Sequence, residues 1–310
     1  MKTRLLLACF LALLYASQPL FADGKKIFIL KSGNLPPFQQ AIEGFKQGLK
    51  NGQIPTEIEE HDLAEGPTQI LAEAEKFYPV LIYAVGSSAA KFAQEKFPGV
   101  PVIFSMVLYP SMSNIGNLSP NANTTGVAMD IPLDRQFEMI RKIVPGAKSI
   151  GVLYNPKETG PIIAQAADLC RQLSLELVAR PVNTPRDVPG ALDGIERKAD
   201  VLWSVADSTV FNGKMPEYIL QYTLQHDLPF VGLSTNFVDA GALFGLCQDF
   251  ADMGMQAAEV AIRVFAGAKP GDIPVIYPRK ILLWLNLRAA DEIGVKINND
   301  VLHSAARIVK

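Results

Sequence analysis

Hydrogen-bonding side chains recur at the ends of the apolar, strand-like runs of this chain. Serine and threonine hydroxyls at these positions, beside expected helix N-termini with free backbone N–H groups, suit a carboxylate or another small anion. The carboxylates of Glu158, Asp207 and Asp249 could pair with an ammonium group, and the ring of Tyr109 could stack on a planar or apolar group. We therefore expect ligand binding by Ser32, Ser87, Ser88, Ser105, Tyr109, Asn155, Glu158, Thr159, Asp207, Ser208, Ser234 and Asp249.

Helix capping is the alternative interpretation of these residues. Ser, Thr, Asn and Asp are the preferred N-caps, so a single one at a strand end needs no ligand. The runs Gly86-Ser87-Ser88 and Asp207-Ser208-Thr209 hold more donors than a cap requires, which favours a ligand for the set as a whole. Among the aromatic residues that follow strand ends, Tyr109 is a better stacking candidate than Phe38, which also begins the apolar stripe of the next helix.

Patterns that would indicate catalysis or a cofactor are absent from the sequence. His61, His226 and His303 have no metal-ligand spacing. The chain has no Gly-x-Ser-x-Gly elbow, phosphate loop or dinucleotide fingerprint. We expect no catalytic residue, no metal and no cofactor. Cys170 and Cys247 are flanked by apolar residues and are expected to be buried thiols, with a single disulfide as the alternative.

The elements that must position these residues alternate between strand-like and helical patterns, which is typical of βα units and parallel sheets. One series runs from residue 25 to about 107, and a second, of similar size, follows residue 130. Three extended segments, 121–132, 241–250 and 273–282, are expected to cross between them. The pattern predicts an α/β fold with two doubly wound, Rossmann-like lobes joined by three hinge crossings. Lobe 1 would contain residues 23–127 and about 250–278, and lobe 2 residues 128–249 and about 279–310.

The N-terminus is typical of a secretory signal peptide. Lys2 and Arg4 precede an apolar stretch of about 12 residues, and small residues lead to an expected cleavage after Ala22. The stretch is shorter than the roughly 20 residues that a membrane-spanning helix needs. Residues 1–22 are therefore predicted to be removed on export. The formal charge of −2, with scattered Lys and Arg, excludes the electrostatic pattern of a nucleic-acid-binding protein.

With this order in view, the chain resembles the substrate-binding proteins of ABC transporters, in particular the tryptophan/tyrosine-type family of the periplasmic binding protein superfamily, type I. The stretches that carry the resemblance are "VPVIFSMVLYP", "NTTGVAMDIP", "IVPGAKSIGVLYNPKE", "ADVLWSVADSTV", "GALFGLCQDFADMGMQAAEVA" and "LNLRAADEIGVKI". The resemblance implies a ligand enclosed between two lobes by hinge closure and delivered to a permease. Thr159-Gly160, Tyr109-Pro110 and Asp207-Ser208 depart from the family's common residues, so the expected cleft is altered.

Together, the residues and the resemblance predict an exported, periplasmic solute-binding protein of an ABC import system. The expected ligand is a small carboxylate-bearing molecule, an amino acid or a related compound, and the resemblance offers an aromatic amino acid as one candidate. The expected macromolecular partner is an ABC permease in the inner membrane, without nucleic acid, and the expected state is a monomer. A ligand sensor for a separate membrane signalling partner is the first alternative, and an exported enzyme on the same scaffold is the second.

Overall fold

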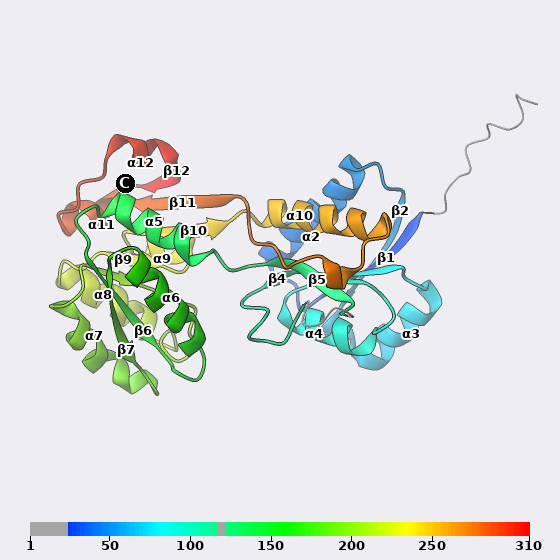
Figure 1. Cartoon of the computed structure of the whole chain (residues 1–310), viewed down its shortest axis with the longest axis horizontal. Coiled ribbons are helices and arrows are strands. Elements are labelled where there is room, and N and C mark those ends of the chain that lie inside the picture. Colours follow the sequence, from blue (N-terminus) through cyan, green and yellow to red (C-terminus); the bar gives the residue numbers. More distant parts are fainter. Residues whose placement is uncertain (1–23, 117–121) are drawn as a thin grey trace, which may run out of the picture. The chain divides into compact units, whose positions relative to one another are not determined.

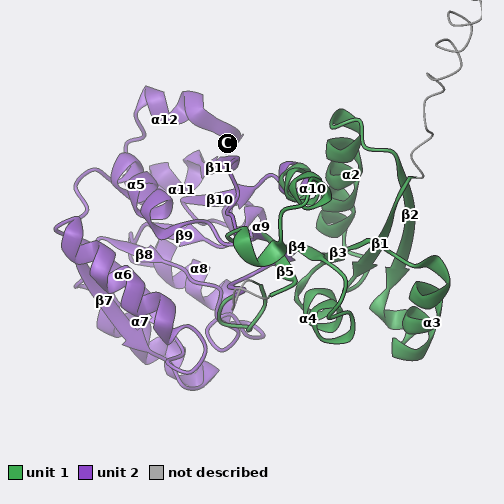
Figure 2. Cartoon of the chain, turned by 45° about the vertical axis from the view of Figure 1, so that its right-hand side comes forward, with its two compact units in different colours: residues 1–105, 111–126, 254–274 green, residues 106–110, 127–253, 275–310 purple. Residues whose placement is uncertain are grey.

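A computed structural model describes residues 24–116 and 122–310, which form two compact units (Figure 2). Unit 1 takes in the described residues up to Ser105, together with Ser111–Gly126 and Gly254–Pro274. Unit 2 takes in Met106–Pro110, Val127–Met253 and Val275–Lys310. The predicted signal peptide, residues 1–22, lies outside the described residues. Within the described ranges, no helix has the length and apolar character that crossing a membrane requires.

Unit 1 is built on a five-stranded sheet of order β2-β1-β3-β4-β5. The pairs β1–β2, β1–β3 and β3–β4 are parallel. Helices α2 and α10 lie on one face of the sheet and α3 and α4 on the other (Figure 1), which is why β3 and β4 are buried along their whole length. The strands are β1 (Lys25–Lys31), β2 (Thr56–Asp62), β3 (Leu81–Val85), β4 (Val102–Val107) and β5 (Thr124–Ala128). The helices are α2 (Pro36–Asn51), α3 (Pro67–Phe77), α4 (Ser87–Lys96) and α10 (Phe250–Phe265).

Helices α2 and α10 pack closely enough to require a glycine. A Cβ added to Gly254 of α10 would lie 1.9 Å from the carbonyl oxygen of Ala41 in α2. Real Cβ atoms do not approach a carbonyl oxygen so closely, so any larger residue would push the helices apart. The apolar stripe expected on α2 is present, with Ile42, Phe45 and Leu49 buried.

Unit 2 is built on a seven-stranded sheet of order β12-β11-β10-β9-β8-β6-β7. Neighbouring strands are parallel except β10 and β11, which are antiparallel. The strands are β6 (Ser149–Tyr154), β7 (Glu176–Pro181), β8 (Val201–Trp203), β9 (Phe230–Gly232), β10 (Phe244–Gln248), β11 (Ile281–Asn286) and β12 (Ala305–Val309). The helices are α5 (Leu133–Ile143), α6 (Gly160–Gln172), α7 (Val188–Glu196), α8 (Met215–Gln225), α9 (Thr235–Asp239), α11 (Leu287–Glu292) and α12 (Asn299–Ser304).

Successive residues of the central strands of unit 2 enter two different cores. Trp203 of β8 packs with Phe137 of α5 in one core, and Leu202 packs with Ile195 of α7 in the other. This alternation is what a strand covered by helices on both faces requires. The α/β fold with two lobes that the sequence predicts is therefore confirmed.

The chain passes between the units at positions that differ in detail from the expected crossings. Two passages, at 126/127 and 274/275, fall inside segments expected to cross. Residues 241–250 instead contribute β10 to unit 2, and the chain enters unit 1 at 253/254, inside α10. The short segment Met106–Pro110 also belongs to unit 2, because the ring of Tyr109 packs against its core.

Candidate ligand-binding site

The predicted hydroxyls of unit 1 occupy two different environments. Ser32 follows β1, and its Oγ accepts a hydrogen bond of 2.9 Å from the backbone N–H of Ala89 in the first turn of α4. Ser87 and Ser88 begin α4 and are exposed. Ser105 is fully buried in β4, and its Oγ lies 2.6 Å from the hydroxyl of Tyr83. Ser87 and Ser88 can therefore reach a ligand, whereas Ser105 is part of the core.

Asp207 is the centre of a hydrogen-bond network at the ends of β6 and β8, which are neighbours in the sheet. One carboxylate oxygen accepts from the backbone N–H of Asn155 at 2.6 Å and from the hydroxyl of Thr159 at 2.7 Å. The other accepts from the backbone N–H groups of Thr209 and Val210 at 3.0 and 3.1 Å. Four bonds fill the acceptor sites of a carboxylate. Asp207 therefore holds two loops together in this structure, which differs from the ammonium-binding role expected from the sequence.

The other predicted residues of these two loops also bond to one another. Asn155 donates from its side-chain amide to the hydroxyl of Thr209 at 2.8 Å. The carboxylate of Glu158 accepts from the backbone N–H and the hydroxyl of Ser208 at 2.8 and 2.7 Å. The structure thus brings Asn155, Glu158, Thr159, Asp207 and Ser208 together as a cross-linked platform.

Ser234 and Asp249 lie at helix starts. Ser234 is the N-cap of the short helix α9. Asp249 accepts a hydrogen bond of 3.0 Å from the backbone N–H of Asp252 at the start of α10, and it also forms an ion pair with Lys280. Both carboxylate oxygens of Asp249 thus have partners within unit 2.

A pocket of about 140 Å³ opens among residues of unit 2. Tyr109 is a predicted site residue, whereas Asp130, Gln136, Trp203 and Gln248 were not expected. Gln136 accepts a hydrogen bond of 2.8 Å from the indole N–H of Trp203, which fixes the orientation of the indole. The lining consists of Leu108, Tyr109, Met129, Asp130, Ile131, Gln136, Trp203, Ser204, Ala206, Val231, Gly232, Leu233, Leu246 and Gln248.

Asp130 contributes a largely buried carboxyl group to this pocket. Burial raises the pKa of its carboxyl to about 6, although a hydrogen bond from the backbone N–H of Tyr109 opposes this effect. Burial and the charge of Asp130 raise the pKa of the Tyr109 phenol, which is therefore neutral at pH 7. A poorly solvated carboxylate beside aromatic rings favours a cation, because a ligand ammonium replaces the water that burial removed.

One sequence signal could have located Asp130. The residue lies two positions after the end of β5, within the stretch "NTTGVAMDIP" that carries the family resemblance. Its burial and its contact with Tyr109 depend on tertiary structure, so the sequence pattern alone does not indicate the raised pKa.

The sequence matches a known protein family. A family model described as ABC transporter substrate binding protein matches residues 26–309. A protein named "Tyrosine-binding protein" from Clostridioides difficile (strain R20291) is 27% identical over 226 residues, which cover 72% of this chain and 61% of that protein. The match thus spans less than two thirds of the relative's length.

Solved structures share the fold. A ligand-free, open substrate binding protein with adhesive properties from Clostridium difficile matches with a TM-score of 0.75 and 20% identity, covering 92% of this chain and 99% of that one. An ABC domain in complex with L-Trp from Streptococcus pneumonia matches with a TM-score of 0.64 and 22% identity, covering 93% and 100%. The fold is that of the type I periplasmic binding proteins.

Proposed function

The chain belongs to the ABC transporter substrate binding proteins, a family that binds solutes rather than converting them, and we propose that its solute is an amino acid with an aromatic side chain or a closely related compound. The observation that carries the proposal is the pocket of unit 2, which Asp130 lines together with Tyr109 and Trp203. A carboxylate pairs with an ammonium group, and aromatic rings favour a planar apolar group.

The size of the pocket agrees with one ring. A buried apolar cavity of about 150 Å³ is known to take benzene, and this pocket has about 140 Å³. It can hold the ring, or the ring edge and the ammonium, but not a whole aromatic amino acid. The ligand carboxylate therefore needs hydrogen-bond donors outside this pocket. We propose the exposed hydroxyls of Ser87 and Ser88 for this role. Closure of the lobes on the ligand stays a prediction from the resemblance.

The names of one relative and of one solved structure support the ligand class. One is called a tyrosine-binding protein, and one solved structure contains L-Trp. The proposal includes export to the periplasm after cleavage near Ala22, a monomeric state and delivery of the solute to an ABC permease. The platform around Asp207 would then position the loops of unit 2 rather than contact the ammonium.

Isothermal titration calorimetry tests the proposal. The protein would be unfolded and refolded to remove bound solute, then titrated with L-tyrosine, L-tryptophan, L-phenylalanine and L-leucine. Binding of one or more aromatic amino acids, with L-leucine at least about tenfold weaker, is expected, because a ring fills the pocket and a branched aliphatic chain does not. Equal binding of L-leucine would contradict the ring-binding role of Tyr109 and Trp203.

Two variants test the role of Asp130. Asp130→Asn should weaken an aromatic amino acid by at least about tenfold, while the analogue without the amino group, 3-(4-hydroxyphenyl)propionate, should bind both proteins equally. Asp134→Asn, an exposed position in the first turn of α5, removes the same charge outside the pocket and is the matched control. An equal loss for both ligands in Asp130→Asn would mean that the carboxylate supports the fold of the pocket instead of pairing with the ammonium.

A further inference from the structure

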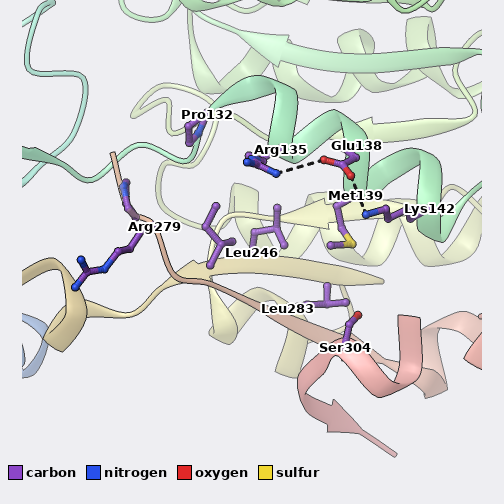
Figure 3. Close-up of a pocket in the computed structure, with 11 residues that line it drawn as sticks. Pro132, Arg135, Glu138, Met139, Lys142, Leu246, Arg279, Leu283 and Ser304 are labelled. Atoms are coloured by element: carbon purple, nitrogen blue, oxygen red, sulfur yellow. Dashed lines mark ion pairs between the residues drawn. The ribbon is translucent and has the colours of Figure 1, made fainter. Parts of the chain in front are cut away.

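Unit 2 contains a second pocket, between α5 and the strands β10 and β11, with α12 at one end (Figure 3). Its volume is about 560 Å³, which lies within the roughly 300–1,000 Å³ of pockets that bind small molecules. The floor is apolar and consists of Met139, Leu246, Ile281 and Leu283. Leu246 and Leu283 are almost completely buried, so this part of the floor belongs to the core of unit 2.

The rim of this pocket on α5 is charged. Arg135, Glu138 and Lys142 line it together with Met139, at the three- and four-residue spacing that places side chains on one helix face. The carboxylate of Glu138 lies 3.7 Å from a guanidinium nitrogen of Arg135 and 2.8 Å from the ammonium nitrogen of Lys142. Figure 3 shows these two ion pairs above the apolar side chains. The part of the rim on α5 thus carries two cations for one anion, and Arg279, which pairs with Asp252, also lines the pocket.

Glu138 shows where a carboxylate can be held at this rim. Its side chain is 51% exposed, and those of Arg135 and Lys142 are 64% and 55% exposed. Exposed ion pairs of this kind contribute little to stability, so Glu138 can leave its position at small cost. A carboxylate supplied by a ligand would contact both cations there. An apolar group attached to it would pack on the floor of the pocket and be buried from water.

We propose that this pocket is a second binding site, which takes a small amphipathic carboxylate in place of the Glu138 side chain. The apolar part of the ligand lies on Met139, Leu246 and Leu283, and its carboxylate lies between Arg135 and Lys142. The charge balance of the rim selects an anion over a cation. The site uses none of the residues proposed to bind the amino group of a solute, so it does not rest on the function proposed above.

Octanoate is the probe for this proposal, because it combines a carboxylate with an apolar chain and has no ammonium group for Asp130. Calorimetric titration of the full protein should show one octanoate per chain at millimolar concentration, at least about tenfold weaker binding of butyrate, and no binding of octylammonium. The double variant Arg135→Ala/Lys142→Ala should weaken octanoate at least about tenfold. Glu138→Gln should strengthen it several-fold, because the competing carboxylate is gone.

Arg141→Ala is the matched control, since Arg141 is exposed on the same helix and does not line the pocket. It removes one positive charge and should leave octanoate binding unchanged. Equal unfolding midpoints of the variants would show that all of them fold. Absence of octanoate binding at about 10 mM, or equal binding by the double variant, would overturn the proposal. A loss of octanoate binding in Asp130→Asn, with the double variant unaffected, would assign octanoate to the other pocket and would also overturn it.

Discussion

Replacing Asp207 by Ala removes the acceptor that joins the loops after β6 and β8. The side chain is 2% exposed and accepts four hydrogen bonds, three from backbone N–H groups and one from Thr159. After the replacement these donors lie in a site that water enters poorly. The structure therefore predicts that Asp207→Ala acts first on stability, with any effect on binding following from disorder of the two loops.

The expected loss can be worked from these bonds. A hydrogen bond to a charged group contributes about 1.5–3 kcal/mol, and a buried donor left without a partner costs about 1–3 kcal/mol. The four bonds share one group and some donors will find water, so the sum is not additive. A loss of about 4 kcal/mol in the free energy of unfolding is a reasonable magnitude. It corresponds to a decrease in Tm of roughly 8–16 °C for a unit of this size.

Urea and thermal unfolding followed by circular dichroism measure this loss directly. Asp207→Asn should lose about half as much, because its remaining oxygen can still accept from Thr209 and Val210. Asp168→Ala removes an exposed carboxylate that pairs with Arg171 on α6, and it should change stability little. An Asp207→Ala protein that unfolds at the native midpoint but no longer binds its solute would refute this reasoning and restore Asp207 as a ligand contact.

Three further expectations concern other parts of the chain. The affinity for an aromatic amino acid should fall as the pH drops below about 6, because burial raises the pKa of Asp130 to about 6 and only the ionised carboxyl attracts ammonium. Dissociation constants measured by calorimetry as a function of pH should show this fall for the native protein but not for Asp130→Asn. Gly254→Ala should lower the free energy of unfolding by about 3 kcal/mol, since the new Cβ would overlap the α2 backbone; an unchanged urea midpoint would contradict that close packing. Cys170 and Cys247 should resist a thiol reagent at pH 8 until urea unfolds the protein, because both are buried and burial raises the pKa of each to about 11. Rapid labelling of the native protein would show that the packing around these thiols opens readily.

The two-lobed α/β fold was predictable because it depends on a repeated local signal. Apolar runs such as residues 79–85 and 149–154 alternate with amphipathic helices. This hydrophobic pattern can be recognised in the sequence whatever the tertiary structure. The antiparallel pairing of β10 and β11 was not predictable in this way. The direction of β11 depends on the path by which the chain re-enters unit 2 at residue 275. No local sequence pattern indicates that path.

The candidate site was predictable in position more than in role. Parallel strands end at one edge, so Asn155 and Asp207 could be placed there from the sequence, but the β8-β6 adjacency that lets them bond to each other could not. Ser105 looked like a strand-end donor and proved to be a core residue paired with Tyr83. Asp130 was missed because its raised pKa is a consequence of burial.

Leu246 lines both pockets of unit 2. A ligand that shifts this side chain in one pocket changes the space available in the other, so the two sites share a mechanical element. Thermodynamic linkage makes any such effect reciprocal: if octanoate alters the affinity for the amino acid by some factor, the amino acid alters the affinity for octanoate by the same factor. In a solute-binding protein of this kind, the dissociation constant for the solute would depend on the concentration of a second metabolite.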